Sequence, residues 1–256
     1  MGKRFNRFNS ETETVENQKK IGTSGEKKKF SIHDLIKYYP KTEAQTNFFR
    51  AYEDGVPVMF QVGPAGTGKT AVALWNMMNE YLSDPTKYDC ILIIRPPVAT
   101  VDLGFMPGDE DDKESYYEDP YREALDDMFK FNASYDNLKS TGVIKFKTSA
   151  NLRGINCNRK LIIVDEFQSA NLHSLKTMFT RLGHGSKICF CGDFGQNDLV
   201  GKKGAQESGF VPFMKIIDRV KSYGNYAVEV IEYGPKDVVR SGIVRDFVIA
   251  CYELNM

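Results

Sequence analysis

The sequence predicts an α/β fold in which helices cover both faces of a mostly parallel sheet. Three observations lead to this prediction. Apolar segments of strand length alternate along the chain with longer segments of helical pattern. Several strand candidates are continuously apolar, as burial on both faces of a parallel sheet requires. A glycine-rich segment, GPAGTGKT, separates the first strand candidate from the helix candidate that follows it.

The expected strands are short apolar segments rich in β-branched and aromatic residues. They are VPVMFQV (56–62), CILIIR (90–95), VIKFKT (143–148), KLIIVD (160–165), KICFCG (187–192) and YAVEVIEY (226–233). The helix candidates are HDLIKYY (33–39) and TEAQTNFFRAYE (42–53), followed by residues 69–82, 120–132, 169–182, 209–221 and 241–254. The alternation of the two types favours parallel strands joined by helical crossovers.

The chain divides at about residue 30. Residues 1–30 are rich in Lys, Glu, Asn, Ser and Thr, which predicts a disordered tail that is basic and polar. Residues 31–256 are expected to form one domain, since 41% hydrophobic side chains in 256 residues suffice for one core. The connection over residues 96–120 is expected to be a long loop, and we interpret its acidic part, residues 109–119, as a solvated surface.

The amino-acid composition excludes few classes of function. Lys+Arg and Asp+Glu both number 34, so no overall field argues for or against nucleic acid. The five cysteines form no CxxC pair, which indicates a reducing, cytoplasmic setting, and Cys189 and Cys191 are interpreted as buried packing residues. Because the chain has no apolar run of membrane-spanning length, we expect no contact with a membrane interior.

The segment GPAGTGKT has the P-loop pattern and the flanking strand and helix that the pattern requires. Its glycines would let backbone N–H groups face a phosphate, and the helix that starts at Lys69 would direct its positive end to the same point. Lys69 would reach the β- and γ-phosphates of a nucleoside triphosphate, and the Thr70 hydroxyl would ligate Mg²⁺. The expected nucleotide-binding residues are Gly63, Pro64, Ala65, Gly66, Thr67, Gly68, Lys69 and Thr70.

The segment LIIVDEFQ supplies the carboxylates that a triphosphate site needs. Its apolar residues form a buried strand that ends at Asp165, and α/β sheets bind ligands at the carboxyl ends of their strands. We expect Asp165 to be a Mg²⁺ partner and Glu166 to polarise the attacking water as general base. The residue types leave the role of Gln168 open.

Other candidate residues are less specific. Gln196, in GDFGQND, could sense the γ-phosphate or belong to a simple turn. Gln45 could hydrogen-bond an adenine edge, although exposed helical glutamines are common. The cation that phosphoryl transfer requires could come from Arg153, Arg181 or Arg240, each of which by itself also suits a surface arginine.

Taken together, these motifs resemble the PhoH-like family of P-loop ATPases, which occurs in bacteria and phages. The similarity runs from about Thr42 to Tyr252. It includes GPAGTGKT, LGFMPGD, DPYREAL, IIVDEFQSAN, TRLGHGSKICFCGDFGQNDL and DVVRSGIV. LGFMPGD and DPYREAL are the most family-specific of these. The family's usual DEAQ is DEFQ here, so Phe167 replaces a small residue, and the family segment VEAGEKLGF is shortened to VATVDLGF.

The resemblance implies a RecA-like fold related to the N-terminal half of superfamily 1 helicases. It also implies ATP binding and hydrolysis, an association with RNA helicase activity, and a location in the cytoplasm, the host's if the chain is phage-encoded. Residue by residue it implies an adenine-reading Gln45, the P-loop pair Lys69 and Thr70, the Walker B pair Asp165 and Glu166, a γ-phosphate sensor at Gln196, and a finger-like Arg240 with Arg181 as second choice.

The leading hypothesis is an ATPase that acts on single-stranded RNA or DNA. Superfamily 1 helicases close two lobes around ATP, and we expect a second subunit to supply the other face here, in a homo-oligomer such as a ring of six. The alternative is an ATP-dependent switch that remodels a protein partner and binds no nucleic acid. A GTPase or small-molecule kinase is disfavoured because the sequence has no NKxD motif.

Overall fold

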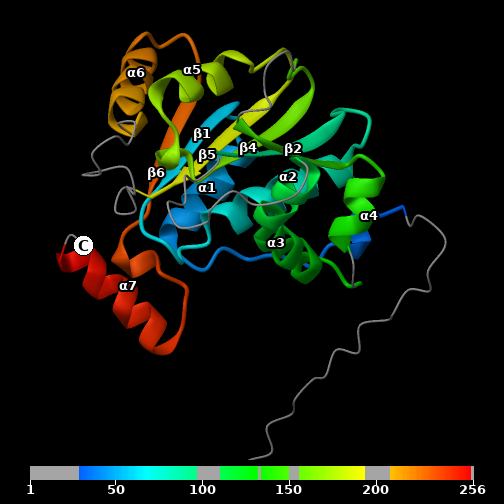
Figure 1. Ribbon diagram of the computed structural model, residues 1–256, viewed down its shortest axis with the longest axis horizontal. Helices are drawn as coiled ribbons and strands as arrows, with labels where there is room; N and C mark the ends of the chain where they lie inside the picture. Colours follow the sequence, from blue (N-terminus) through cyan, green and yellow to red (C-terminus); the bar gives the residue numbers. More distant parts are fainter. Residues whose placement is uncertain (1–28, 97–109, 132–133, 150–155, 194–207, 255–256) are drawn as a thin grey trace, which may run out of the picture.

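The computed structural model describes residues 29–96, 110–131, 134–149, 156–193 and 208–254. In these ranges six parallel strands form one sheet, and helices cover both of its faces (Figure 1). The strands are β1 (Val58–Val62), β2 (Cys90–Arg95), β3 (Ile144–Thr148), β4 (Lys160–Asp165), β5 (Lys187–Gly192) and β6 (Val228–Glu232). Each of these strands lies within a segment predicted from sequence, and the predicted α/β class is confirmed.

The strand order is β3-β2-β4-β5-β1-β6, and every pairing is parallel. The carboxyl ends of all strands therefore lie along one edge of the sheet. Gly63 follows β1 at this edge, Asp165 ends β4, and Asp193 follows β5, which separates the other two strands. This is the edge at which α/β sheets bind ligands.

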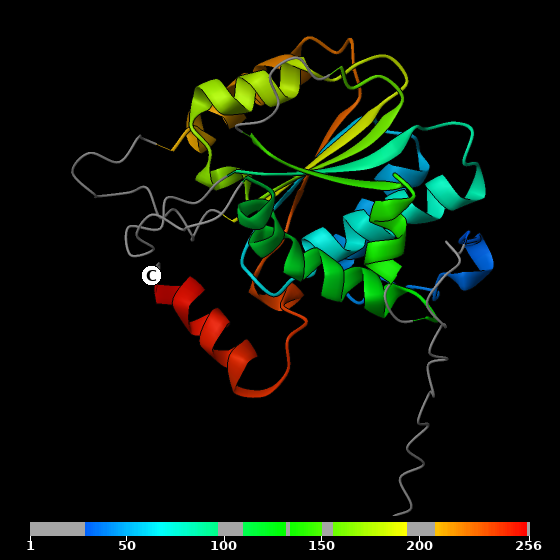
Figure 2. The same ribbon diagram turned by 45° about the vertical axis from the view of Figure 1, so that its right-hand side comes forward.

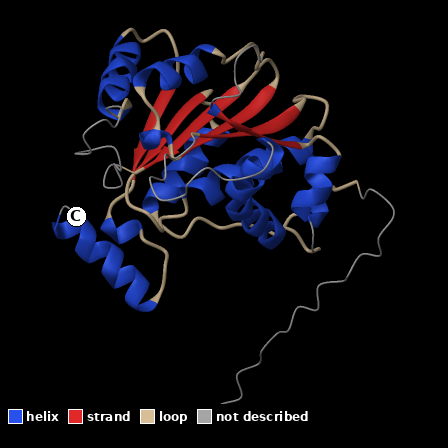
Figure 3. Ribbon diagram, viewed as in Figure 1, coloured by secondary structure: helices blue, strands red, loops and turns tan. Residues whose placement is uncertain are grey.

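The helices form two layers with the sheet between them (Figures 2 and 3). One layer contains α1 (Glu43–Glu53), α2 (Lys69–Ser83), α3 (Glu110–Met128) and α4 (Ser134–Ser140). The other contains α5 (Leu172–Thr180) and α6 (Phe210–Ser222). The last helix, α7 (Gly242–Leu254), lies away from the sheet beyond the short 3-10 helix Pro235–Asp237.

Each face of the sheet carries its own hydrophobic core. Successive side chains of β1 alternate between them: Met59 packs in the core beneath α1 and α2, and Phe60 packs in the core beneath α5 and α6. Phe60 also stacks on Phe190 of β5, with ring centroids 4.8 Å apart. Burial on both faces explains why these strands are continuously apolar in the sequence.

The predicted helix over residues 33–39 is wrong. Only Ile32–Asp34 is helical, as a short 3-10 turn, because the following backbone is hydrogen-bonded to a distant segment. The Ile36 N–H donates to the carbonyl of Met128 at 2.8 Å, and Leu35 forms an antiparallel bridge with Phe129. Tertiary pairing therefore overrides the local helical pattern.

The predicted loop over residues 96–120 is also wrong in its second half, because α3 begins at Glu110 and not near Pro120. Proline favours the first turn of a helix, yet here Pro120 lies inside α3. The sequence EDDKE at 110–114 has the acidic first turn that is typical of a helix start, a signal that the loop prediction did not use. Residues 97–109 lie outside the described ranges.

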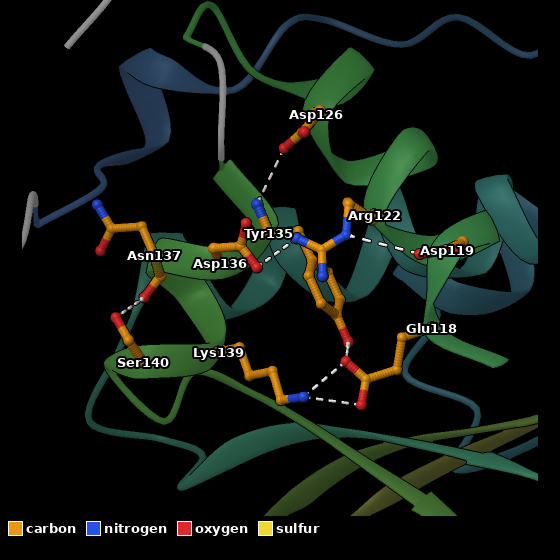
Figure 4. A network of polar contacts seen from close by, with 9 residues as sticks. All are labelled: Glu118, Asp119, Arg122, Asp126, Tyr135, Asp136, Asn137, Lys139 and Ser140. Atoms are coloured by element: carbon orange, nitrogen blue, oxygen red, sulfur yellow. Dashed lines mark hydrogen bonds and ion pairs between the residues drawn. The ribbon is translucent and has the colours of Figure 1, made fainter. Parts of the chain in front are cut away.

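Helix α4 was not predicted, and polar contacts hold it against α3 (Figure 4). The buried carboxylate of Glu118 accepts hydrogen bonds from Lys139 and from the Tyr135 hydroxyl, each at 2.7 Å. Arg122 pairs with Asp136. These contacts fix the position of α3 and thus of the Tyr121 side chain that it carries.

Two expectations from composition can be compared with the structure. Cys189 and Cys191 are fully buried, as predicted, and their thiols are free. No helix in the described part of the chain combines the length and hydropathy needed to cross a bilayer. The tail predicted over residues 1–30 lies almost entirely outside the described ranges.

Candidate active site

The segment Gly63–Thr70 joins β1 to α2 at the carboxyl edge of the sheet. Gly63 and Gly66 have positive φ angles of 151° and 77°. A Cβ atom at Gly63 would lie 2.2 Å from the carbonyl oxygen of Tyr233, and one at Gly66 would lie 2.9 Å from Cγ of Arg240. Glycine is therefore required at both positions, by backbone conformation and by close packing.

Lys69 is the first residue of α2, and its ammonium group lies within the curve of the loop. It donates hydrogen bonds to the carbonyl oxygens of Gly63 at 2.7 Å and Pro64 at 2.8 Å. Burial lowers the pKa of Lys69, and the carboxylates of Asp193, Glu166 and Asp165 oppose this shift. A lysine and a helix N-terminus directed at one glycine-rich curve suit a polyphosphate.

Thr70 and Asp165 are brought together from α2 and from the end of β4. The Thr70 hydroxyl donates to Oδ1 of Asp165 at 2.7 Å. A hydroxyl and a carboxylate are hard oxygen donors, and Mg²⁺ in phosphate sites is held by one or two such protein groups with substrate oxygens and waters completing its shell. The donor set at this position therefore fits Mg²⁺.

Tyr121 contacts the other oxygen of the same carboxylate. Its hydroxyl, buried on α3, donates to Oδ2 of Asp165 at 2.8 Å. Burial, together with the charge of Asp165, raises the pKa of Tyr121 well above its ordinary value, so the phenol remains a donor. Sequence reasoning did not select this residue, and its only signal is its place in the DPYREAL motif.

Glu166 follows β4 in a left-handed backbone conformation, with φ of 50°. Oε2 of Glu166 accepts a hydrogen bond from Nε2 of Gln168 at 2.6 Å, and Oε1 of Gln168 accepts one from the backbone N–H of Asp193 at 3.1 Å. Burial first, and the neighbouring charge of Asp165 second, raise the pKa of Glu166. Gln168, whose role the sequence left open, thus links the Glu166 carboxylate to the end of β5.

Gln45 is fully buried beneath the loop. Its Nε2 donates to the carbonyl oxygen of Thr67 at 2.9 Å, and its Oε1 accepts from the backbone N–H of Lys41 at 2.8 Å. Both ends of the amide are therefore bonded within the chain, and the side chain braces the loop. Its predicted role in reading adenine stays a prediction.

Residues 233–240, which we call the strap, pass over the loop. The backbone N–H of Val239 donates to the carbonyl oxygen of Gly66 at 2.9 Å, and the Tyr233 hydroxyl donates to Oε1 of Gln61 at 2.6 Å. The strap also places the stem of Arg240 beside Gly66 of its own chain. Arg240 is exposed, so its guanidinium lies at the surface next to the loop.

One further predicted residue, Arg181, is not brought to this edge. Arg181 ends α5 near Cys157, which precedes β4, and so it lies at the opposite edge of the sheet from Asp165. From this position it cannot reach the loop of its own chain. Gln196 and Arg153 lie outside the described residues.

The family model and the similar proteins point to the same family. The model for the PhoH-like protein family matches residues 37–253. A PhoH-like protein of Mycobacterium leprae is 35% identical over 215 residues, which cover 84% of this chain and 58% of that protein. One of Bacillus subtilis is 32% identical over 216 residues, which cover 84% of this chain and 64% of that protein. The chain thus spans about three fifths of the length of these curated relatives. The solved Pif1 helicase from Candida albicans aligns with 78% of this chain and 40% of its own, with a TM-score of 0.37 and 13% identity.

Proposed function

Because the chain belongs to the PhoH-like protein family, we propose that it is a Mg²⁺-dependent ATPase of the cytoplasm that is stimulated by single-stranded RNA or DNA and works as a homo-oligomer. The residues described above form a P-loop with a site that suits a nucleotide. We propose in addition that the chain hydrolyses ATP, responds to a nucleic acid and assembles into an oligomer.

The observation that supports hydrolysis best is the arrangement of Glu166. Glu166 directly follows Asp165, which is bonded to Thr70. The carboxylate of Glu166 accepts a hydrogen bond from Gln168, and its partial burial raises its pKa. A raised pKa brings a carboxylate nearer to the value at which a general base is most effective. A loop that only bound nucleotide would not need a partly buried, oriented carboxylate at this place.

In the proposed reaction each residue has a separate task. Lys69 neutralises charge on the β- and γ-phosphates, and the loop's N–H groups hold the remaining oxygens. Glu166 accepts the proton of the water that attacks the γ-phosphorus, and Gln168 keeps the carboxylate in position. Thr70 and Asp165 would hold Mg²⁺, which when bound neutralises charge on the phosphate oxygens.

The nucleic-acid and oligomer parts of the proposal rest on the family resemblance and not on a contact in this structure. The test is the rate of ATP hydrolysis with and without single-stranded RNA, and separately with single-stranded DNA. Stimulation by either, lost in Glu166→Gln, supports the proposal. A Glu166-dependent rate that responds to neither nucleic acid would contradict the nucleic-acid part and favour a protein-remodelling switch.

Replacing Tyr121 with Phe is expected to raise the Mg²⁺ concentration needed for half-maximal hydrolysis by roughly 10-fold. This is near the lower end of the effect that removal of a hydrogen bond to a metal ligand usually has on metal affinity. The reason is that Oδ2 of Asp165 loses its donor and the carboxylate loses its fixed orientation. A Mg²⁺ titration at fixed ATP measures the change.

The matched control is Tyr52→Phe, which also removes a hydroxyl from a carboxylate, that of Glu80, but near the end of α2 that is far from the P-loop. It is expected to leave the Mg²⁺ requirement unchanged. Equal Mg²⁺ curves for Tyr121→Phe and the unaltered chain would show that Tyr121 does not position Asp165.

A further inference from the structure

Helix α7 turns its apolar side chains toward solvent. Ile243, Phe247 and Leu254 are 84%, 68% and 67% exposed, and no residue of the helix is buried. With Val244 and Cys251 they recur at the three- and four-residue spacing of one helical face, which we call the α7 stripe. The charged residues Arg245, Asp246 and Glu253 lie off this stripe. An amphipathic helix normally packs such a stripe on a core, so its exposure marks a docking surface.

A second apolar surface lies on α6, in the helical layer on the other face of the sheet. Ile216 and Tyr223 are 42% and 58% exposed, lie seven residues apart on one face of the helix, and form what we call the α6 surface. Figures 1 and 2 both place α6 and α7 on different sides of the molecule. The two surfaces therefore cannot cover each other within one chain in this arrangement.

The charges around the two surfaces are of opposite net sign. Three exposed cations, Lys215, Arg219 and Lys221, accompany the α6 surface with one anion, Asp218. On α7 the anions Asp246 and Glu253 outnumber the cation Arg245. Surfaces of this kind attract one another and disfavour contact with a like surface.

We propose that the α7 stripe of one copy of this chain docks on the α6 surface of a second copy. This deepens the proposed function, since it rests on the oligomer named there and gives it an interface. Because the two surfaces differ, the contact is head-to-tail, and repetition leads to a ring if the rotation closes and to an open array if it does not.

The size of α7 sets the strength of the contact. A standard interface involves about 20–30 residues a side. The α7 stripe has five residues, so it supplies at most about a quarter of one side. Assembly should accordingly depend on protein concentration. Helix α7 also begins directly after the strap, whose Arg240 packs on Gly66, so the neighbouring copy would lie close to the P-loop.

Sedimentation velocity of the full chain tests the proposal at about 50 μM protein, with and without Mg²⁺ and a non-hydrolysable ATP analogue. The unaltered chain is expected to assemble, and Phe247→Glu and Ile216→Glu are each expected to shift assembly to at least about 10-fold higher concentration. An equimolar mixture of the two variants retains one intact α7 stripe and one intact α6 surface. It is expected to form dimers and nothing larger.

The control is Tyr39→Glu, which adds the same charge to a side chain 71% exposed and outside both surfaces, and which should assemble like the unaltered chain. Circular dichroism and thermal unfolding of each variant check that the domain is folded. A monomeric unaltered chain under all conditions would overturn the proposal. So would an Ile216→Glu chain that assembles normally, because that would mean that α7 pairs with α7 or with another surface.

A cross-link gives an independent readout that does not weaken the contact. Cys251 lies on the α7 stripe and is the one cysteine of the five that is not buried. Under mild oxidation by oxidised glutathione, Ile216→Cys is expected to yield a ladder of disulfide-linked dimers and larger species, and Ile216→Cys with Cys251→Ser to yield none. Cross-linked dimers of the unaltered chain, with no ladder in Ile216→Cys, would overturn the head-to-tail contact.

Failure of this inference can be distinguished from failure of the proposed function. ATP hydrolysis is measured on the same samples, with Glu166→Gln as the blank. A monomeric chain with Glu166-dependent hydrolysis would refute the interface and leave the ATPase in place. An assembled chain without Glu166-dependent hydrolysis would support the interface and refute the ATPase.

Discussion

Replacing Glu166 with Gln is expected to lower the rate of ATP hydrolysis by roughly 10²- to 10⁴-fold, the usual contribution of a positioned general base. The amide has nearly the same shape as the carboxylate but cannot accept the proton of the attacking water. ATP should still bind, because Lys69 and the loop are unchanged. Single-turnover hydrolysis and equilibrium binding of a fluorescent ATP analogue measure the two quantities separately.

Glu232→Gln serves as the control for this change. Glu232 ends β6 beside Val62 and is exposed, and it lines a surface pocket with Asn47 and Arg50 of α1. Its replacement is expected to leave hydrolysis within about two-fold of the unaltered rate, as for surface changes of small free energy. Hydrolysis at the unaltered rate in Glu166→Gln would exclude Glu166 as the base.

Replacing Phe167 with Ala is expected to lower the free energy of unfolding by roughly 3–5 kcal/mol, as for other fully buried phenylalanines. Phe167 is 0% exposed, and its ring centroid lies 4.8 Å from that of Phe210 and 5.6 Å from that of Phe190. The ring fills space that Gly192 leaves, since a Cβ at Gly192 would come within 2.6 Å of it. Removal would leave a cavity directly behind Glu166.

Urea unfolding followed by circular dichroism measures this effect, with Tyr39→Ala as the comparison. Tyr39 is 71% exposed, and its loss should change stability by no more than about 0.5 kcal/mol. A loss below about 1 kcal/mol in Phe167→Ala would mean that the core closes around the site.

Most of the fold could be predicted from the sequence because its signals are local. Parallel strands buried on both faces are apolar almost throughout, and the four inner strands β1, β2, β4 and β5 show this. The edge strands β3 and β6 instead alternate apolar residues with lysine or glutamate, which is the other strand pattern. The P-loop is equally local, since glycines, Lys69 and Thr70 must follow one another between a strand and a helix. Asp165 and Glu166 were found for the same reason, as polar residues that end a buried strand.

The rest depended on contacts between distant segments. The backbone of residues 35 and 36 pairs with residues 128 and 129 and does not continue as a helix. The sequence around residues 35 and 36 gives no signal for this pairing. Tyr121 lies 44 residues from Asp165, and Tyr233 lies 172 residues from Gln61, so their hydrogen bonds form only when the sheet and helices have assembled.

The sequence by itself therefore determined the fold class, the loop and the two carboxylates, because each is specified by neighbouring residues. Only the tertiary structure decided which side chains hold those groups in place. It showed Gln168 bonded to the backbone of Asp193, Gln45 bonded beneath the loop, and Arg240 beside Gly66 of its own chain. The physical reason is that orientation of a side chain comes from packing and hydrogen bonds across the fold, which no local pattern encodes.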